Sequence, residues 1–287
     1  MSHEAERAAY LDTLLEQRCT RPEWFVVDGE SRAVLWSLPG GEVPSHFVLV
    51  ETDWDDPQLR DGRALMGRVH ELAAKLGAHE LRHTIDSPPV APQYQERPEE
   101  RVALLEATGY ELARDGLRWR LSSPSAIASD GPLTFRTLPE VGEGAFVDAI
   151  AATFEGTADS ELTLDIEHHG AHEAARRYLD DHKSLEHRPE WFELVYDGDA
   201  LVGVIMGARN PTSAVIAYVG VVPEQRGRGL AAALVRRGTA RLAATGATEI
   251  RGDCDRDNVA MARAFERAGY VQFARRRSFR HALRVQA

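Results

Sequence analysis

The chain of 287 residues repeats part of itself, because an ordered series of matches links its two halves. The clearest match is Arg-Pro-Glu-Trp-Phe, which stands at Arg21–Phe25 and again at Arg188–Phe192. Four more pairs of segments keep the same order: His3–Ala5 with His172–Ala174, Tyr10–Asp12 with Tyr178–Asp180, Gly77–Arg82 with Gly246–Arg251, and Glu106–Tyr110 with Glu266–Tyr270. The matched residues lie 160 to 169 positions apart. This period exceeds that of a solenoid repeat, so we interpret the chain as two copies of one domain.

The two copies are unequal in what precedes their shared part. The segment Gly131–Ala171 precedes the shared part of the second copy, whereas that of the first copy begins at His3. The first copy therefore lacks the opening strand and helix, or receives their equivalent from elsewhere. The run Ser122–Ala126 is small and polar, which is typical of a linker. We expect a first domain at 1–122, a linker at 123–130 and a second domain at 131–287.

Hydrophobic periodicity predicts the order β-α-α-β-β-β-α-β-α-β for the second copy. The expected strands are Leu133–Leu138, Trp191–Tyr196, Leu201–Met206, Ala214–Val222, Glu249–Cys254 and Tyr270–Phe279. The expected helices are Gly144–Phe154, Glu167–Leu185, Gly229–Ala244 and Asn258–Ala268. The fourth strand is almost wholly apolar, as expected for a central strand that is covered on both faces. The order indicates an α/β fold built on a mixed sheet (α+β mixed sheet).

A turn with two glycines follows the apolar strand and leads directly into a helix. It reads Arg226-Gly227-Arg228-Gly229-Leu230-Ala231. Glycine permits backbone conformations that are closed to other residues, so successive N–H groups can point into one concavity. The first turn of the helix adds unpaired N–H donors and the positive end of its dipole. A pyrophosphate group is the expected guest, with the two arginines supplying positive charge. The alternative is a tight turn without a ligand.

This loop resembles the pattern [Arg/Gln]-x-x-Gly-x-[Gly/Ala] of the GCN5-related N-acetyltransferases (GNAT). Asn258, followed by Phe265 and then by Gly269-Tyr270, is similar to the closing helix of that family. The resemblance covers the chain from Gly131 onward and agrees with the element order. It implies a tandem GNAT-like acyl-CoA N-acyltransferase fold in which the second copy is complete and the first is degenerate.

The resemblance also implies how acetyl-CoA, the acyl donor, would bind. Strand Val219–Val221 should diverge from strand Glu249–Cys254 and leave backbone groups free for the pantetheine amides. Asn258 would bond to the pantetheine arm, although a plain helix cap is the alternative interpretation of this residue. The residues implied in cofactor binding are Val219, Gly220, Val221, Arg226, Gly227, Arg228, Gly229, Leu230, Ala231, Asn258 and Phe265.

The catalytic positions of the family are filled differently in this chain. Many members carry a carboxylate on the central strand as general base, but Ala214–Tyr218 contains none. Many carry a tyrosine on the last helix as general acid, where this chain has Phe265. We take Tyr218 and Asp253 as candidate catalytic residues. The alternatives are a core aromatic for the former and a solvated loop carboxylate for the latter.

Other carboxylates are candidates for recognition of the acceptor. Asp255 could orient an amine through water, and Glu155 and Asp159 follow the first helix, where the acceptor site of the family usually forms. In the first copy, the glycine loop is replaced by 55–63, whose three aspartates repel a pyrophosphate and whose Pro57 lacks an N–H donor. Gly62 could align with Gly227, but the second glycine is still missing. We expect this copy to bind no CoA. It would pack against the active domain and close one side of the acceptor pocket, or serve only as a scaffold.

The favoured function is an N-acetyltransferase that moves an acetyl group from acetyl-CoA to an amine of a small molecule. The amine would attack directly in a ternary complex. Two alternatives stay open: a non-catalytic acyl-CoA sensor or partner-binding module, and an acetyltransferase that acts on a protein amine. A monomer and a homodimer are both compatible with the sequence.

Composition restricts the location and the partners. The net charge of −11 argues against general nucleic-acid binding, and no nucleic-acid role is assigned to the run Arg275–Arg277. No apolar run reaches the roughly 20 residues of a membrane span, and the charged N-terminus lacks a signal-peptide core. Cys19 and Cys254 are expected to be buried thiols in a cytoplasmic protein. His168, His169 and His172 are expected to be exposed rather than metal ligands, so no metal is expected.

Overall fold

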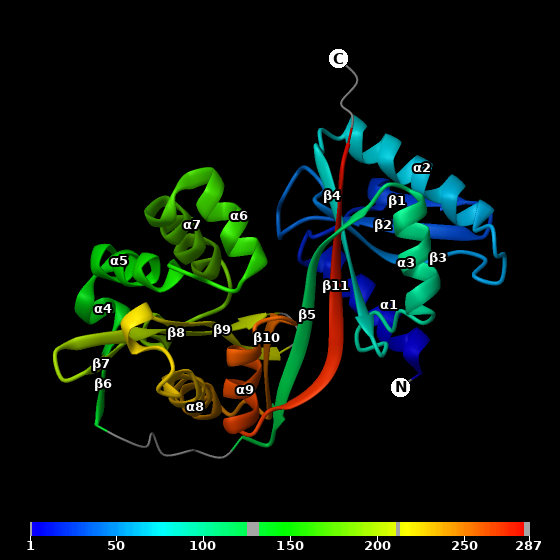
Figure 1. Cartoon of the computed structure of the whole chain (residues 1–287). Coiled ribbons are helices and arrows are strands. Elements are labelled where there is room, and N and C mark those ends of the chain that lie inside the picture. Colours follow the sequence, from blue (N-terminus) through cyan, green and yellow to red (C-terminus); the bar gives the residue numbers. More distant parts are fainter. Residues whose placement is uncertain (1, 125–131, 211–212, 284–287) are drawn as a thin grey trace. The chain divides into compact units, whose positions relative to one another are not determined.

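The computed structural model of the chain describes residues 2–124, 132–210 and 213–283. Most of the linker expected at 123–130 therefore lies outside the described residues. The chain forms two compact units, Met1–Asp115 together with Ala274–Ala287, and Gly116–Phe273. Figure 1 shows the elements of both units, and each unit is described by itself below.

The first unit is a five-stranded sheet with helices on both faces. Its strands follow the order β1-β2-β3-β4-β11, and the bounds of its elements are α1 His3–Glu16, a 3-10 turn Pro22–Trp24, β1 Phe25–Asp28, β2 Ser31–Trp36, β3 His46–Glu51, α2 Arg60–Lys75, β4 Glu80–Ser87, α3 Pro98–Ala107 and β11 Val271–Ala282. Because side chains alternate along a strand, Val34 packs with Leu14 of α1 on one face. Leu35 faces the other side and packs with Val69 of α2.

The second unit is a six-stranded sheet in the order β5-β10-β9-β8-β7-β6. The bounds of its elements are β5 Glu111–Ser122, β6 Leu133–Thr137, α4 Leu138–Val141, α5 Glu143–Phe154, α6 Ser160–His169, α7 Ala171–Lys183, a 3-10 turn Pro189–Trp191, β7 Phe192–Asp197, β8 Ala200–Asn210, β9 Ser213–Val221, a 3-10 turn Pro223–Gln225, α8 Leu230–Ala243, β10 Glu249–Asp255 and α9 Val259–Arg267. Helices α4 to α7 gather on one face of the sheet, and α8 and α9 on the other (Figure 1).

The repeat seen in the sequence is a structural repeat. The order α1, 3-10 turn, β1, β2, β3, α2, β4, α3, β5 recurs as α7, 3-10 turn, β7, β8, β9, α8, β10, α9, β11, with one additional 3-10 turn, Pro223–Gln225, before α8. The shared Pro-Glu-Trp forms the same 3-10 turn in both copies, and Trp24 and Trp191 are both buried. The mixed α/β sheet predicted from the sequence is confirmed.

The helix expected over Glu167–Leu185 is in fact two helices. Gly170 separates α6 from α7 and has φ 78°, a left-handed conformation that ends the first helix. Helix α6 begins earlier than predicted because the carboxylate of Asp159 accepts hydrogen bonds from the N–H groups of Glu161 and Leu162, both at 3.0 Å. The sequence prediction missed this cap.

The last strand of each copy completes the sheet of the other unit. Residues 116–122 of β5 pair antiparallel with the whole of β10, from Asp255↔Gly116 to Glu249↔Ser122. Residues 275–282 of β11 pair antiparallel with β4. Trp119 of β5 is thereby buried in the second unit beside Phe265, and Phe279 of β11 is buried in the core of the first unit.

The arginine run on β11 anchors that strand in the first unit. Arg275 donates two hydrogen bonds to Asp115, at 2.6 and 2.8 Å, and Arg276 donates two to Asp86, at 2.9 and 2.8 Å. Arg277 donates to both carboxylate oxygens of Glu99, at 3.1 and 2.8 Å. Three consecutive bidentate pairs of this kind fix the register of a strand as well as its attachment.

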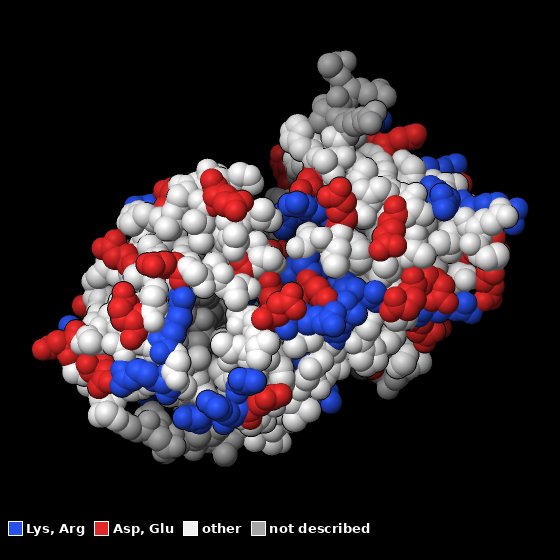
Figure 2. Space-filling view, in the orientation of Figure 1, with Lys and Arg blue, Asp and Glu red and all other residues white. Residues whose placement is uncertain are grey.

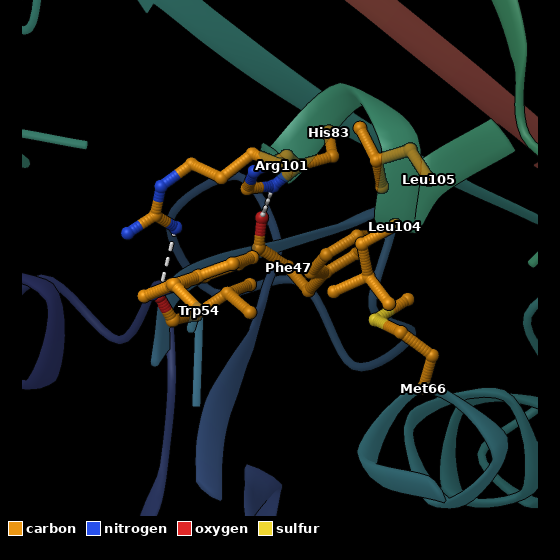
Figure 3. A pocket seen from close by; sticks show the side chains of 8 residues that line it. Phe47, Trp54, Met66, His83, Arg101, Leu104 and Leu105 are labelled. Atoms are coloured by element: carbon orange, nitrogen blue, oxygen red, sulfur yellow. Dashed lines mark hydrogen bonds between the residues drawn. The ribbon is translucent and has the colours of Figure 1, made fainter. Parts of the chain in front are cut away.

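A buried polar network fills the space between β3, β4 and α3 in the first unit (Figure 3). His83 is 2% exposed, its Nδ1–H donates to the carbonyl of Phe47 at 2.8 Å, and the side-chain amide of Gln95 lies 3.1 Å from its Nε2. Burial lowers the pKa of His83 to about 3, so the imidazole is neutral. Arg101 donates to the carbonyl of Val50 at 2.8 Å. The remaining space, about 10 Å³, is close to what one water molecule needs.

The strand exchange predicts that two core truncations destabilise different units. Trp119→Ala should destabilise the second unit, although Trp119 belongs to the first copy, and Phe279→Ala should destabilise the first unit. Each should lower the free energy of unfolding by about 3–5 kcal/mol. Hydrogen exchange should accelerate in β10 and α9 for the former variant and in β4 and α2 for the latter. Faster exchange in β4 and α2 for Trp119→Ala, or in β10 and α9 for Phe279→Ala, would contradict the strand exchange.

The buried histidine predicts a pH dependence of stability. The folded pKa of His83 is depressed below its unfolded value near 6.5, so its contribution is fully present above pH 6.5 and is lost as pH falls toward 3. About 2 kcal/mol of the free energy of unfolding should disappear between pH 7 and pH 5. Urea unfolding of His83→Gln should lack this part of the slope. Identical slopes in both proteins would show that the imidazole is not held neutral.

Candidate functional site

Strands β9 and β10 of the second unit lie side by side only where they begin. Their parallel pairing consists of Ile250↔Ala214 and Arg251↔Val215. Strand β9 continues on its other side with β8, as far as Val221↔Gly203, and β10 continues with β5 as far as Asp255. The C-terminal halves of β9 and β10 therefore diverge from each other, as the sequence resemblance implied.

The backbone of β9 offers polar groups to this gap. A Cβ added at Gly203 would lie 2.0 Å from the carbonyl oxygen of Gly220, so that carbonyl points toward β8. Successive residues of a strand point their backbone groups to opposite sides. The backbone groups of Val219 and Val221 therefore face the gap, where no described strand pairs with them. A ligand with amide groups could complete the ladder there.

The glycine loop presents a set of amide hydrogens at one end of the gap. Gly227 and Gly229 both have φ 77°, and Gly229 is the N-terminal cap of α8. Gln225 and Arg226 donate their N–H groups to the carbonyls of Val222 and Pro223, which closes the preceding turn. Throughout the described chain, no protein acceptor is found for the N–H groups of residues 227–231. Together with the dipole of α8, these donors form an anion site that fits a pyrophosphate.

The two arginines of the loop hold the protein together at this site. Arg226 donates from Nε to the carbonyl of Val221 at 3.0 Å and from Nη2 to that of Thr153 at 3.0 Å, which ties the end of β9 to α5. Arg228 donates from Nη2 to Asp197 at 2.8 Å, in a half-exposed ion pair. The sequence indicated phosphate ligands, whereas the structure gives both side chains protein partners. The backbone therefore supplies most of the anion-binding groups.

Tyr218 lies next to a bulge and donates its proton to a threonine. The register between β8 and β9 shifts at Met206/Gly207, which leaves Ala217 without an opposite residue. The Tyr218 hydroxyl lies 2.6 Å from Oγ1 of Thr153, which itself donates to the carbonyl of Ile150 at 2.6 Å. Tyr218 is therefore the donor of the pair.

The surroundings of Tyr218 keep it protonated. Burial raises its pKa far above the ordinary value, and the charge of Asp159 acts in the same direction. The phenol is thus a hydrogen-bond donor and no general base at neutral pH. A Cβ at Gly220 would lie 2.5 Å from the Tyr218 hydroxyl and 2.6 Å from Thr153 Oγ1, so this position requires glycine.

His182 is a candidate that the sequence reasoning missed. It lies on α7, its Nδ1–H donates to the carbonyl of Tyr178 at 2.7 Å, and burial lowers its pKa. Its ring also bonds to the backbone of Ala217, the bulged residue beside Tyr218. The ring of Tyr178 lies 4.2 Å from His182 and 5.1 Å from Tyr218. The spacing of Tyr178 and His182, one helical turn apart, was the signal available in the sequence.

The acidic candidates are engaged in fixing the local fold. Asp253 lies 3.4 Å from Nε of Arg118, a buried residue of β5. Asp255 accepts the N–H of Ser160 at 2.8 Å and so attaches the start of α6 to the end of β10. Asp159 caps α6, and Glu155 is exposed at the end of α5. The structure brings Asp159 near Tyr218 but gives Asp253 a cationic partner.

The two candidates from the last helix differ in accessibility. Asn258 caps α9 by accepting the N–H of Met261 at 3.0 Å, and in the described residues its side-chain nitrogen has no protein partner. It can therefore be a cap and a ligand-binding group at once. Phe265 is 1% exposed, packs between Trp119 and Tyr270, and would lie 2.5 Å from a Cβ at Gly252. Its side chain belongs to the core, so the structure does not place it toward the gap.

The first copy has a similar start to its strand pair, but its own groups fill the equivalent site. Strands β3 and β4 pair in parallel at His46↔Arg82. The carboxylate of Asp56 accepts the N–H groups of Gln58 and Arg60, at 3.0 and 3.1 Å, where α2 begins. The Arg60 side chain and these N–H groups lower the pKa of Asp56 to about 2. Position Leu59, with φ 51°, takes the place of Gly229 as the cap. Gly62 lies inside α2, so its alignment with Gly227 is wrong.

The histidines singled out by their helical spacing lie at the surface. His169 approaches Asp165 of its own helix at 3.9 Å, and His172 lies 3.1 Å from Asp148. Within 2–124, 132–210 and 213–283, no group of three or more potential metal ligands occurs. None of the helices in these ranges is long and apolar enough to cross a membrane.

Known proteins resemble both the sequence and the fold of this chain. The profile of the acetyltransferase (GNAT) family matches residues 157–270. An acetyltransferase of Yersinia enterocolitica and one of Sodalis glossinidius are each 34% identical over 92 residues, 32% of this chain and 65% of those proteins. The chain thus spans about 65% of the length of these curated relatives.

Two solved structures extend the likeness to the whole chain. A GCN5-related N-acetyltransferase from Sphaerobacter thermophilus has a TM-score of 0.58 at 20% identity, over 91% of this chain and 84% of that one. A tandem GNAT protein from the clavulanic acid biosynthesis pathway has a TM-score of 0.50 at 17% identity, over 91% and 82%. At these identities the likeness shows a common fold. Residues 157–270, in the second copy, are therefore similar to the GNAT acetyltransferase family, and the whole chain shares its fold with solved proteins of that description.

Proposed function

We propose that the second unit binds acetyl-CoA and transfers its acetyl group to an amine of a small molecule. The observation that carries this proposal is the divergence of β9 and β10 beside the unpaired amide hydrogens of residues 227–231. A diphosphate fits the loop, and the pantetheine amides fit the backbone groups of Val219 and the N–H of Val221, whose carbonyl already accepts from Arg226. Asn258 would hold the same arm from the other side of the gap. The similarity of residues 157–270 to the GNAT family supports the choice of acetyl-CoA over other nucleotides.

The chemistry requires a neutral amine, close approach to the thioester, and a proton for the departing thiolate. The amine nitrogen attacks the carbonyl carbon, the C–S bond breaks, and the sulfur takes up a proton. The chain's groups around the bulge at Ala217 are the phenol of Tyr218 and the imidazole of His182. We assign to His182, which is neutral and bonds to the backbone of Tyr178 and Ala217, the positioning of the bulge, and the proton that the amine loses passes to the departing thiolate, directly or through water. Tyr218 donates a hydrogen bond, and positioning within a closed gap supplies much of the acceleration.

The partners of the chain follow from the same proposal. We propose a small-molecule amine as acceptor and no nucleic acid or membrane, with a monomer or a homodimer in the cytoplasm. Acidic and basic side chains occur in small interspersed groups on the face shown in Figure 2, without one extended basic area. A protein amine as acceptor is the alternative within the same chemistry.

A second candidate function is an acyl-CoA sensor that performs no chemistry. Three observations support this second candidate function. Strand β9 carries no carboxylate, the Tyr218 proton is directed at Thr153, and Asp253 pairs with Arg118. A sensor would use the gap and the loop in the same way, without turnover.

The loop assignment predicts a difference between two glycine substitutions. Gly229→Ala and Gly246→Ala both place a side chain at positive φ, 77° and 84°, and should cost a similar amount of stability, about 1 kcal/mol. Gly246 ends α8, far along the chain from the anion site. Only Gly229→Ala should weaken acetyl-CoA binding, by roughly tenfold or more, because it disturbs the amide concavity. Calorimetry should find one acetyl-CoA per chain. Equal affinities in both variants, or two sites per chain, would refute the assignment.

The catalytic assignment predicts a separation of binding from turnover. Tyr218→Phe should keep the affinity for acetyl-CoA and lower kcat by about 10²-fold, because only the hydroxyl is removed. CoA release should be followed with a thiol reagent across a panel of small amines and one peptide amine. Release with any amine excludes the sensor, whereas saturable binding without release across the panel favours it.

A further inference from the structure

One face of the second unit's sheet carries a cluster of arginines beside the gap. Gly252 of β10 faces α9, since a Cβ there would lie 2.5 Å from Phe265. Side chains alternate along a strand, so Arg251, Asp253 and Asp255 face the opposite side. Asp255 contacts the start of α6 on that side. This is the face that carries Tyr218, whose hydroxyl bonds to α5.

The strand exchange places two arginines directly opposite each other on this face. The register of β5 and β10 pairs Arg120 with Arg251, and Arg118 with Asp253. Like charges at directly opposed positions of an antiparallel pair destabilise the sheet. A sequence selected only for stability would avoid the Arg120–Arg251 pair. We therefore expect an anion to bind beside these two arginines.

Three guanidinium groups lie around a single aromatic ring. The guanidinium carbons of Arg118, Arg120 and Arg251 lie 5.0, 5.4 and 5.4 Å from the ring centre of Phe273. Cation–π attraction at these distances is favourable but does not neutralise charge. The ring therefore holds three like charges together that would otherwise move apart.

Of the three arginines, Arg118 and Arg251 have acidic partners in the described chain, whereas Arg120 has none there. Asp253 pairs with Arg118 at 3.4 Å, and Glu249 with Arg251 at 2.7 Å. Arg120 is exposed, and in the part of the chain that the structure describes no carboxylate lies within ion-pair distance of it. The charge of Arg120 is thus not neutralised by an ion pair within the described residues. An exposed guanidinium group without an ion pair, held opposite a second arginine, is a suitable site for an anion.

The location connects the cluster with the proposed reaction. The last rung of the β9–β10 ladder is Arg251↔Val215, so the arginine pair lies where the gap begins to open. We propose that Arg120 and Arg251 bind an anionic group, a carboxylate or a phosphate, of the acceptor whose amine is acetylated. This inference rests on the proposed function. The planar guanidinium groups suit bidentate recognition of either anion.

The test measures anion binding on the full chain by thermal unfolding. Inorganic phosphate and succinate are titrated separately, with saturating CoA present so that the glycine loop is filled. At least one of them should raise the Tm of the unmodified protein by roughly 2–4 °C. Arg120→Gln should abolish this rise, Arg120→Lys should keep part of it, and the control Arg176→Gln, an exposed arginine on α7, should keep all of it.

The Tm measured without anion distinguishes anion binding by Arg120 from a role of Arg120 in stabilising the fold. Since Arg120→Gln removes the repulsion with Arg251, its Tm without anion should stay within about 2 °C of the unmodified protein. A large fall in that Tm, an unchanged anion response in Arg120→Gln, or no response to either anion in the unmodified protein would each overturn the proposal. Acetyl-CoA affinity, measured separately by calorimetry, reports failure of the proposed function. The anion response then remains interpretable without it.

Discussion

The backbone hydrogen bonding of β10 is the constraint on which the second unit depends. On one side β9 leaves this strand after two pairs, Ile250↔Ala214 and Arg251↔Val215. On the other side β5 pairs with β10 along its whole length. A strand that is open on one edge must be held firmly on the other, because unpaired buried backbone groups are costly. The gap that would hold the cofactor therefore exists because a strand from the first copy supports it.

The two copies show how one framework becomes open or closed to a ligand. In the second copy the turn before α8 leaves amide hydrogens without acceptors. In the first copy the carboxylate of Asp56 accepts the equivalent hydrogens, and Arg101 and His83 donate to the carbonyls of β3. These side chains satisfy the polar groups that a cofactor would otherwise satisfy. Loss of a ligand site is thus compensated inside the protein rather than left as an empty cleft.

Local patterns in the sequence predicted much of this fold but not its long-range pairing. The repeat, the element order and the glycine loop followed from spacing and periodicity, because these depend on neighbouring residues. The exchange of β5 and β11 did not, since either strand fits either sheet by its alternation. The arginine run 275–277 did carry that information, but only once its partners Asp115, Asp86 and Glu99 were known. Tyr218, Asp253 and Phe265 were singled out in the sequence, but their contacts with Thr153, Arg118 and Trp119 depend on the tertiary structure and could not be predicted from it.

The exchanged strand β11 also has a consequence for synthesis on the ribosome. Its arginines meet partners that lie up to 190 residues earlier in the chain. Until β11 has been made, β4 presents an unpaired edge, and such edges recruit strands from other chains. The sheet of the first unit therefore stays without its last strand until the entire second copy has been translated. Chaperones that shield nascent sheet edges would be of most use to this protein during that interval.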